Sequence, residues 1–213
     1  MRIHFDEQLD RLNEEIINMG TLIQQAIGMA VEALIKRDVE KAKQTMDFDA
    51  EIDHQEKIIE NLCLKLLLQQ QPVARDLRVI SAALKMITDM ERIGDHASDI
   101  SELAIQLADL PPVEQLPDVE AMAKETMVML IQGLEAYVER NYEKAEKVIV
   151  HDDVIDDLFD RVKQELIEII QKNSDFAGQA ADLLMVAKYF ERIGDHATNI
   201  AEWVIFSITG KHE

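Results

Sequence analysis

The stretch Met90–Ser101, M-E-R-I-G-D-H-A-S-D-I-S, decides the fold because it returns almost unchanged one hundred positions later. Phe190–Ala201 reads F-E-R-I-G-D-H-A-T-N-I-A, so seven residues, E-R-I-G-D-H-A, are identical in an unbroken row. Both copies lie in segments of helical periodicity, where a like-charged pair four residues apart costs about 0.2–0.5 kcal/mol. An interior glycine costs about 1 kcal/mol more than alanine. Because the chain carries both penalties twice, we expect compensation from outside the helix, and a bound cation is the simplest candidate.

The composition is that of a helical globular protein with a strong negative charge. Of the 213 residues, 47% are hydrophobic and 5% aromatic, which allows a sizeable core and argues against disorder. The 42 acidic and 22 basic residues give a formal net charge of −20. Such a charge repels nucleic acid and attracts metal ions and basic partners, so we expect no nucleic-acid binding. The single cysteine, Cys63, lies in an apolar run, which predicts a buried thiol.

The sequence predicts neither a targeting peptide nor a membrane span. The first ten residues are amphipathic and acidic, unlike a secretory signal peptide. No stretch approaches the roughly 18 uninterrupted apolar residues that a membrane-spanning helix needs. We therefore expect a cytoplasmic protein that does not insert into membranes.

Apolar residues recur three and four positions apart along most of the chain, which predicts helices, and no segment alternates as a strand does. The strongest break is Leu110–Pro117, which lies at the midpoint and holds three of the four prolines. We expect 1–109 and 118–213 to be two tandem three-helix bundles, joined by a linker at 110–117. The six predicted helices are about 5–36, 38–70, 72–108, 118–140, 141–172 and 174–210.

The two halves match beyond the shared motif. V-E-K-A-K at Val39–Lys43 aligns with Y-E-K-A-E at Tyr142–Glu146 at an offset of 103 residues, against 100 at the motif. The turn before the third helix is therefore three residues shorter in the second half. This predicts an all-α fold made of two copies of one unit of three antiparallel helices. The expected N-terminal caps are Asp38, Asn141 and either Ser174 or Asp175.

Acidic residues gather along one side of several predicted helices. The third and sixth predicted helices each carry an apolar core seam, formed by Met90, Ile93, Ala97, Ile100 and Ala104 and by Phe190, Ile193, Ala197, Ile200 and Val204. Glu91, Asp95 and Asp99 lie about half a turn from the first of these seams, on the outer face of the bundle or in a groove at its edge. If neighbouring helices present such stripes to each other, four to six carboxylates converge, and a hard cation such as iron, manganese, magnesium or calcium neutralises them. No cysteine and histidine cluster of the zinc type occurs. The candidate ligands are Asp49 and Asp53; Glu91, Asp95 and Asp99; Asp152, Asp156 and Asp160; and Glu191, Asp195 and Asn199.

The two halves differ at the candidate ligands. Asp99 becomes Asn199, and Lys57 becomes Asp160, so one carboxylate is lost and one is gained. We therefore expect two metal sites that differ in nuclearity or affinity. For the remaining motif residues we expect structural roles: the glycine allows close helix crossing, the arginine pairs with acids, and the histidine is hydrogen-bonded or in the core.

The repeated E-R-I-G-D-H-A, the duplicated D-x-x-x-D and the segment P-V-A-R-D-L-R-V-I-S-A-A-L-K at Pro72–Lys85 resemble the PhoU family of phosphate-signalling regulators. The resemblance covers nearly the whole chain and implies two three-helix bundles. It also implies surface clusters of iron, with manganese, magnesium, zinc or calcium as alternatives, held by E/D-x-x-x-D motifs. Here those motifs are Glu91 with Asp95, Glu191 with Asp195, Asp49 with Asp53, and Asp152 with Asp156; Asn199 departs from an all-acid stripe.

The same resemblance implies a biological role. PhoU proteins are expected to be cytoplasmic, commonly homodimeric, negative regulators of the phosphate regulon. The implied partners are the ATPase of the phosphate ABC transporter and its sensor histidine kinase.

Two other functions fit an acidic helical chain less well. A ferritin-like di-iron protein needs two E-x-x-H motifs, whereas this chain has one, Glu51–His54, whose counterparts are Val154 and Asp157. A metal-free helical adaptor would use its acidic faces only for solubility. The sequence shows no nucleophile–base pair, phosphate-cradling glycine-rich loop or kinase signature, so we expect no enzymatic activity.

Overall fold

The computed structural model describes residues 2–69, 73–110 and 117–211, and every regular element in these ranges is a helix. Almost all of the predicted linker 110–117 lies outside the described residues. Among the described helices, none is long and apolar enough to cross a membrane.

All six predicted helices are present, with ends that differ from the predicted ones by a few residues. A short 3-10 turn, Ser174–Phe176, precedes the last of them. The helices are α1 (Arg2–Lys36), α2 (Val39–Gln69), α3 (Ala74–Ala108), α4 (Pro117–Glu139), α5 (Tyr142–Lys172) and α6 (Ala177–Thr209).

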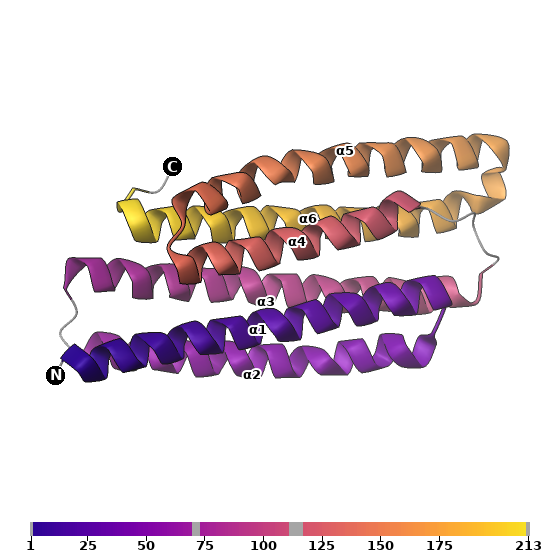
Figure 1. Cartoon of the computed structure of the whole chain (residues 1–213). Helices are drawn as coiled ribbons and strands as arrows, with labels where there is room; N and C mark the ends of the chain where they lie inside the picture. The colour runs from indigo at the N-terminus through magenta and orange to yellow at the C-terminus, as the bar shows by residue number, and fades with distance from the viewer. Residues whose placement is uncertain (1, 70–72, 111–116, 212–213) are drawn as a thin grey trace.

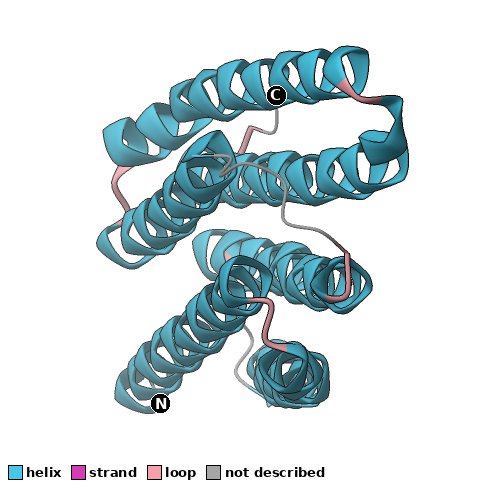
Figure 2. Ribbon diagram, turned by 90° about the vertical axis from the view of Figure 1, so that its right-hand side faces the viewer, coloured by secondary structure: helices cyan, strands magenta, loops and turns pink. Residues whose placement is uncertain are grey.

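The helices form two groups of three, so the predicted fold is confirmed. Figure 2 shows α1–α3 in one group and α4–α6 in the other, seen along the helices. Within each group, successive helices run antiparallel (Figure 1). The groups meet where α3 packs on α6 and α1 packs on α4. Because α3 and α6 carry the two copies of the motif, the fold places the repeated sequences next to each other.

Side-chain caps mark three of the helix starts. Asp38 accepts a hydrogen bond from the backbone N–H of Lys41 at 2.9 Å, and Asn141 accepts one from Lys144 at 3.0 Å, as predicted. The predicted cap at Ser174 or Asp175 is wrong. Asn173 accepts from the backbone N–H of Asp175 at 3.0 Å, because a short asparagine side chain reaches the N–H two residues on and turns the chain without a full helical cap.

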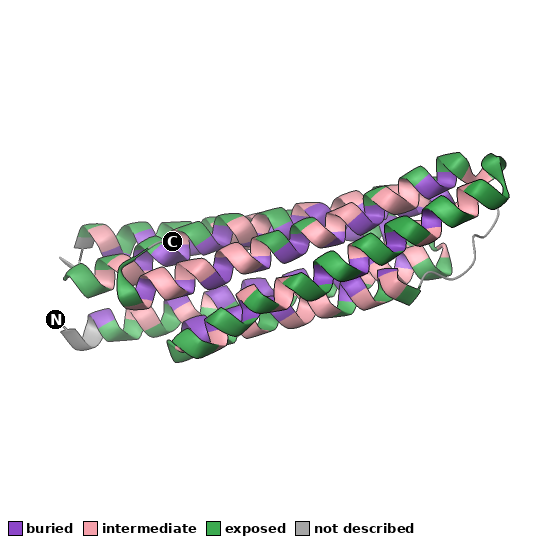
Figure 3. Cartoon of the chain, turned by 90° about the horizontal axis from the view of Figure 1, so that it is seen from above, coloured by how far each residue is buried: buried purple, intermediate pink, exposed green. Residues whose placement is uncertain are grey.

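The core is continuous through both groups of helices. The predicted apolar seams are buried: Met90, Ile93, Ala97, Ile100 and Ala104 on α3, and Phe190, Ile193, Ala197, Ile200 and Val204 on α6. One connected cluster of buried side chains includes residues of all six helices, and Cys63 is buried in it, as predicted. Figure 3 shows buried segments facing inward along the whole length of the helices.

We expect the continuous core to make the chain unfold in one transition. Phe190→Ala removes a fully buried ring from α6 and should lower the free energy of unfolding by about 3–5 kcal/mol. Ile17→Ala, at a side chain that is 46% exposed, should cost less than about 1 kcal/mol. Urea denaturation followed by circular dichroism measures both. Separate transitions for the two halves in Phe190→Ala would contradict a shared core.

Candidate functional site

The predicted ligands of the first half lie on adjoining sides of α2 and α3. We call Asp49, Asp53, Glu91, Asp95 and Asp99 the first acid stripe. Burial, followed by the charges of Asp95 and Asp53, raises the pKa of Asp49 from 3.8 to about 6. Burial and the charge of Asp95 also raise the pKa of Glu91. The two helices therefore bring their carboxylates within electrostatic range of each other.

The second half repeats this arrangement on α5 and α6. We call Asp152, Asp156, Asp160, Glu191 and Asp195 the second acid stripe. Burial, followed by the charges of Asp195 and Asp156, raises the pKa of Asp152 from 3.8 to about 6. Burial and the charge of Glu191 raise the pKa values of Asp156 and Asp195. Asp160 is exposed and pairs with Lys163, so it lies at the outer end of the stripe.

The motif glycines allow an aspartate to approach the neighbouring helix closely. A Cβ atom at Gly194 would lie 2.9 Å from Oδ1 of Asp152. A Cβ at Gly94 would lie 3.3 Å from Oδ1 of Asp49 and 2.9 Å from Cδ1 of Ile52. The predicted close helix crossing is confirmed, and it also positions a carboxylate against the helix that carries the motif.

The buried oxygens of the stripes fit the donor set of a hard cation. Oδ1 of Asp49 and Oε2 of Glu191 are buried and have no hydrogen-bond partner in the structure. A buried carboxylate oxygen without a partner is costly, and carboxylate oxygens are the ligands that iron, manganese, magnesium and calcium prefer. As the side chains lie, no three Asp, Glu, His or Cys residues in the described ranges surround one point closely enough to hold an ion. Coordination therefore requires carboxylate side chains to rotate.

Basic residues neutralise part of each stripe, but differently in the two halves. In the first, Arg92 pairs with Asp95 at 2.7 Å and with Glu91 at 3.4 Å, as predicted. In the second, Arg192 makes no ion pair with a described residue, so the predicted pair is wrong. Lys188 pairs with Glu191 at 2.5 Å instead.

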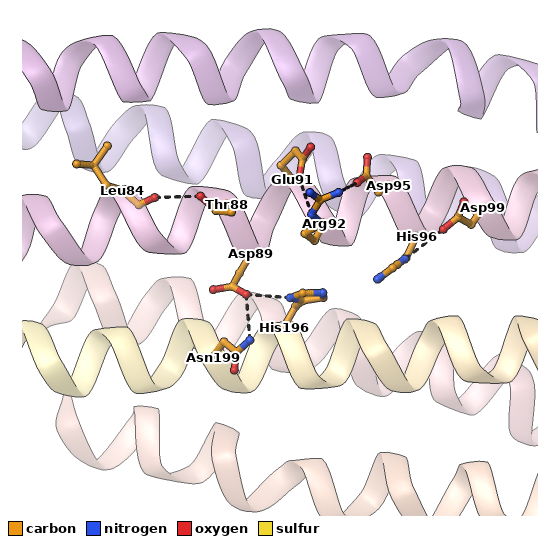
Figure 4. A network of polar contacts seen from close by, with 10 residues as sticks. All are labelled: Leu84, Thr88, Asp89, Glu91, Arg92, Asp95, His96, Asp99, His196 and Asn199. Carbon is orange, nitrogen blue, oxygen red and sulfur yellow. Dashed lines mark hydrogen bonds and ion pairs between the residues drawn. The ribbon is translucent and has the colours of Figure 1, made fainter. Parts of the chain in front are cut away.

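Polar contacts also join α3 to α6, as Figure 4 shows. The side-chain amide of Asn199 donates to Oδ1 of Asp89 at 3.0 Å, and Nδ1 of His196 lies 2.8 Å from the same oxygen. Asn199 thus contacts the first half. His96 is buried, and its Nδ1 lies 3.2 Å from Oδ2 of Asp99. Both histidines are hydrogen-bonded, as predicted, and their ring centroids are 5.5 Å apart.

A cavity of about 320 Å³ opens beside the first acid stripe. It includes Arg192 of the second half, so the junction of the two groups of helices forms part of its wall. Nε2 of the buried His96 has no hydrogen-bond partner. The cavity is lined by Asp49, Arg92, Asp95, His96, Ser98, Asp99 and Arg192.

Four charged residues near the stripes were not predicted from the sequence. Glu56 lies close to Asp53. Burial is the largest cause that raises the pKa of Glu56, followed by the negative charges of Glu60 and Asp53. Glu56 lies three residues after Asp53, so helical spacing could have placed it among the predicted site residues. Lys188 is likewise at helical spacing, three residues before Glu191 on α6, and Asp153 adjoins Asp152 on α5. Asp89 carries no such signal, because its partner His196 lies on another helix.

The match to a known protein family agrees with the duplicated arrangement of the chain. The family described as "PhoU domain" matches the chain twice, at residues 16–104 and 119–204. The chain belongs to the PhoU family. A Clostridium acetobutylicum protein named "Phosphate-specific transport system accessory protein PhoU homolog" is 38% identical over 208 residues, which is 97% of this chain and 95% of that protein. A Synechocystis protein of the same name is 35% identical, over 100% of this chain and 94% of its own length.

Solved PhoU structures share the arrangement of helices. The crystal structure of PhoU from Pseudomonas aeruginosa matches with a TM-score of 0.91 and 30% identity, covering 97% of this chain and 100% of that one. The phosphate transport system regulatory protein PhoU from Streptococcus pneumoniae matches with a TM-score of 0.90 and 27% identity, over 98% and 99% of the two chains. The family resemblance inferred from the repeated motif is confirmed.

The raised aspartate pKa values predict how stability depends on pH. A carboxyl whose folded pKa is about 6 binds its proton more tightly when folded than when unfolded at 3.8. Its contribution to the free energy of unfolding is therefore fully present below 3.8 and is lost as the pH rises through 6. In chelator, Asp49→Asn should be more stable than the parent at neutral pH by about 1 kcal/mol after allowing for solvent screening, and the difference should vanish in acid.

Urea denaturation at a series of pH values measures this difference. The matched control is Asp47→Asn, at an exposed aspartate of the same helix, which should change stability by less than about 0.5 kcal/mol at any pH. A loss of stability in Asp49→Asn at neutral pH would show that the carboxylate is well compensated by the protein itself.

The close approach at the motif glycine predicts an unusual response to alanine. Gly28→Ala, with no atom within 4 Å of the new Cβ, should stabilise α1 by about 0.5–1 kcal/mol through helix propensity. Gly194→Ala should lose that gain, because its Cβ would meet the Asp152 carboxylate at 2.9 Å. Thermal unfolding of the two variants makes the comparison. Equal stabilisation of both would contradict the close contact.

Proposed function

We propose that this chain is an accessory protein of phosphate transport that represses phosphate uptake and the phosphate regulon by protein–protein contact. The supporting observation is the family match over both repeats, together with relatives of nearly equal length named as phosphate-specific transport accessory proteins. A structural relative is likewise named as a phosphate transport regulatory protein. A protein that regulates by contact with a partner needs no catalytic residues. The candidate site consists of the carboxylates of the two acid stripes and the basic side chains paired with them.

The charge of the chain favours partners with basic surfaces. The net charge of −20 and the two acid stripes provide a field that a basic face on the transporter ATPase or on the sensor histidine kinase complements. Association should weaken as salt rises, because screening shortens the range of that attraction. We place the protein in the cytoplasm, where those partners present their surfaces, and expect a homodimer.

Each acid stripe is proposed to hold metal ions. Carboxylate donors suit iron, manganese, magnesium and calcium alike. The family resemblance makes iron the first choice, with manganese, magnesium, zinc or calcium as alternatives. The first site uses Asp49, Asp53, Glu91, Asp95 and Asp99; the second uses Asp152, Asp156, Asp160, Glu191 and Asp195, while the proposed ligand Asn199 must first leave Asp89.

The bound ion supplies positive charge that neutralises the crowded carboxylates, and it changes the surface offered to a partner. The partnerless oxygens of Asp49 and Glu191 support this role. A ferritin-like function finds no support in the described part of the chain, because Glu51 and His54 are both exposed on α2.

Genetic deletion and complementation test the regulatory function. Deleting the gene should derepress a phosphate-repressed phosphatase in high phosphate, and the intact chain should restore repression. Repression that persists after deletion would reject the proposal and favour the metal-free adaptor or a metal store.

The two metal sites should be separable by mutation. Glu91→Ala with Asp95→Ala removes carboxylates from the first stripe only, so the protein should lose the metal of that stripe and keep the metal of the second. Metal analysis of protein purified without chelator or affinity metal measures the ratio of metal to chain. Loss of all metal from this double variant would show one site shared between the halves.

A further inference from the structure

A cluster of arginines lies at the end of the molecule where α1 and α3 begin and where α4 and α6 end, at the left in Figure 1. Arg75 and Arg78 come from the segment P-V-A-R-D-L-R, which the acid stripes do not use. Arg140 follows the last turn of α4. Burial lowers the pKa of the Arg140 guanidinium, and the charges of Arg75 and Arg78 act in the same direction. Three guanidinium groups therefore share one small region.

These arginines make no close ion pair with a described residue, in a chain whose acidic residues outnumber basic ones by 42 to 22. The charge of Asp76 nevertheless acts on Arg140. Nε of Arg78 is buried without a hydrogen-bond partner. The stem of Arg78 packs against the end of α6, where a Cβ at Gly210 would lie 3.2 Å from its Cδ. The guanidinium is thus held in place and still has an unused donor.

A cavity of about 300 Å³ lies beside Arg140. Tyr137 lines it and is only 4% exposed, and its hydroxyl has no hydrogen-bond partner. A buried hydroxyl without a partner is costly, so a bound group that accepts or donates there is favoured. The cavity is also lined by Asn13 and Ser207, and by the carboxylates of Asp6, Asp10 and Asp76.

This mixture of donors and carboxylates fits one kind of anion in particular. Guanidinium and hydroxyl groups bind oxyanions by charge-assisted hydrogen bonds. A carboxylate repels an oxyanion that has no proton, but it accepts a hydrogen bond from one that has. Inorganic phosphate keeps a proton at neutral pH, whereas sulfate does not. The cavity is therefore suited to phosphate and unsuited to sulfate.

We propose that this end of the molecule is a binding site for inorganic phosphate, with Arg140 and Tyr137 of the cavity wall as donors, Arg75 and Arg78 as nearby positive charges, and an aspartate as acceptor of the phosphate proton. The choice of phosphate among oxyanions rests on the proposed function. The site lies apart from the acid stripes and gives the protein its own means of responding to phosphate.

The internal repeat provides a natural comparison, because the opposite end of the molecule lacks the site. Arg37 corresponds to Arg140, and both have left-handed backbones, with φ of 54° and 53°. Arg37 instead donates a hydrogen bond to the carbonyl of Leu110. The other groups of the site have no counterpart: at the offsets of 103 and 100 residues, Tyr137 corresponds to Leu34, Arg75 to Asp175 and Arg78 to Gly178. We expect one phosphate per chain.

Isothermal titration calorimetry with inorganic phosphate tests the site on the full chain prepared free of phosphate. We expect saturable binding of one phosphate, and at least tenfold weaker binding of sulfate. Arg140→Gln should weaken phosphate binding at least tenfold, and Arg78→Gln, which removes a nearby positive charge, should weaken it several-fold. Tyr137→Phe keeps the buried ring and should weaken binding several-fold without changing the helix content by circular dichroism.

Two control variants separate this site from other sources of phosphate binding. Arg37→Gln makes the same charge change at the equivalent position of the other half and should bind phosphate as the parent does. Glu91→Gln with Asp95→Asn alters the first acid stripe and should also leave binding unchanged. Loss of binding in the stripe variant and not in the arginine variants would overturn the proposal, since phosphate would then bind through metal.

Three further results would also overturn it: no saturable phosphate binding by the parent chain, sulfate bound as tightly as phosphate, or normal binding by folded Arg140→Gln and Tyr137→Phe. The complementation assay keeps this failure distinct from failure of the proposed function. A chain that restores repression but binds no phosphate would refute the phosphate site alone.

Discussion

The contact between an aspartate carboxylate and a glycine of the neighbouring helix is the constraint on which the site depends. Asp152 against Gly194, and Asp49 against Gly94, require the two helices of each pair to lie so close that any larger motif residue would displace its neighbours. The same closeness partly excludes water from the carboxylates and leaves buried oxygens without partners. The charge penalty and the packing are therefore one feature: the glycine that allows tight packing also concentrates the negative charge that favours a cation.

Duplication places two versions of this feature in one molecule without making them identical. The first stripe is partly neutralised by Arg92, which pairs with two of its acids, and the second by Lys188, which pairs with Glu191, so the basic partner is placed differently in the two stripes. Between them, the α3–α6 contact brings the two motif histidines within 5.5 Å of each other and ties Asn199 to Asp89. A change at either stripe thus acts on a helix that is packed directly against the other half, within a single continuous core.

Periodicity alone predicted the six helices, the two buried seams and the acid stripes, because each depends on residues three or four positions apart on one helix. The partner of Asn199 could not be predicted in that way. Asp89 reaches Asn199 only because the two groups of helices dock along α3 and α6. The pair of Lys188 with Glu191 has helical spacing and could have been found, but comparison of the repeats does not point to it, because Lys188 has no basic counterpart in the first repeat. The cap at Asn173 was missed for a local reason, since asparagine, serine and aspartate compete for the same turn.

Anomalous X-ray diffraction from crystals of the protein loaded with iron or manganese tests the central claim most directly. Data on the two sides of the metal's absorption edge locate each ion without assumptions about its ligands. The account predicts anomalous peaks at two places, one between α2 and α3 beside Asp49 and one between α5 and α6 beside Asp152. A single peak on the α3–α6 contact between the two histidines, or no peak near either aspartate, would contradict it.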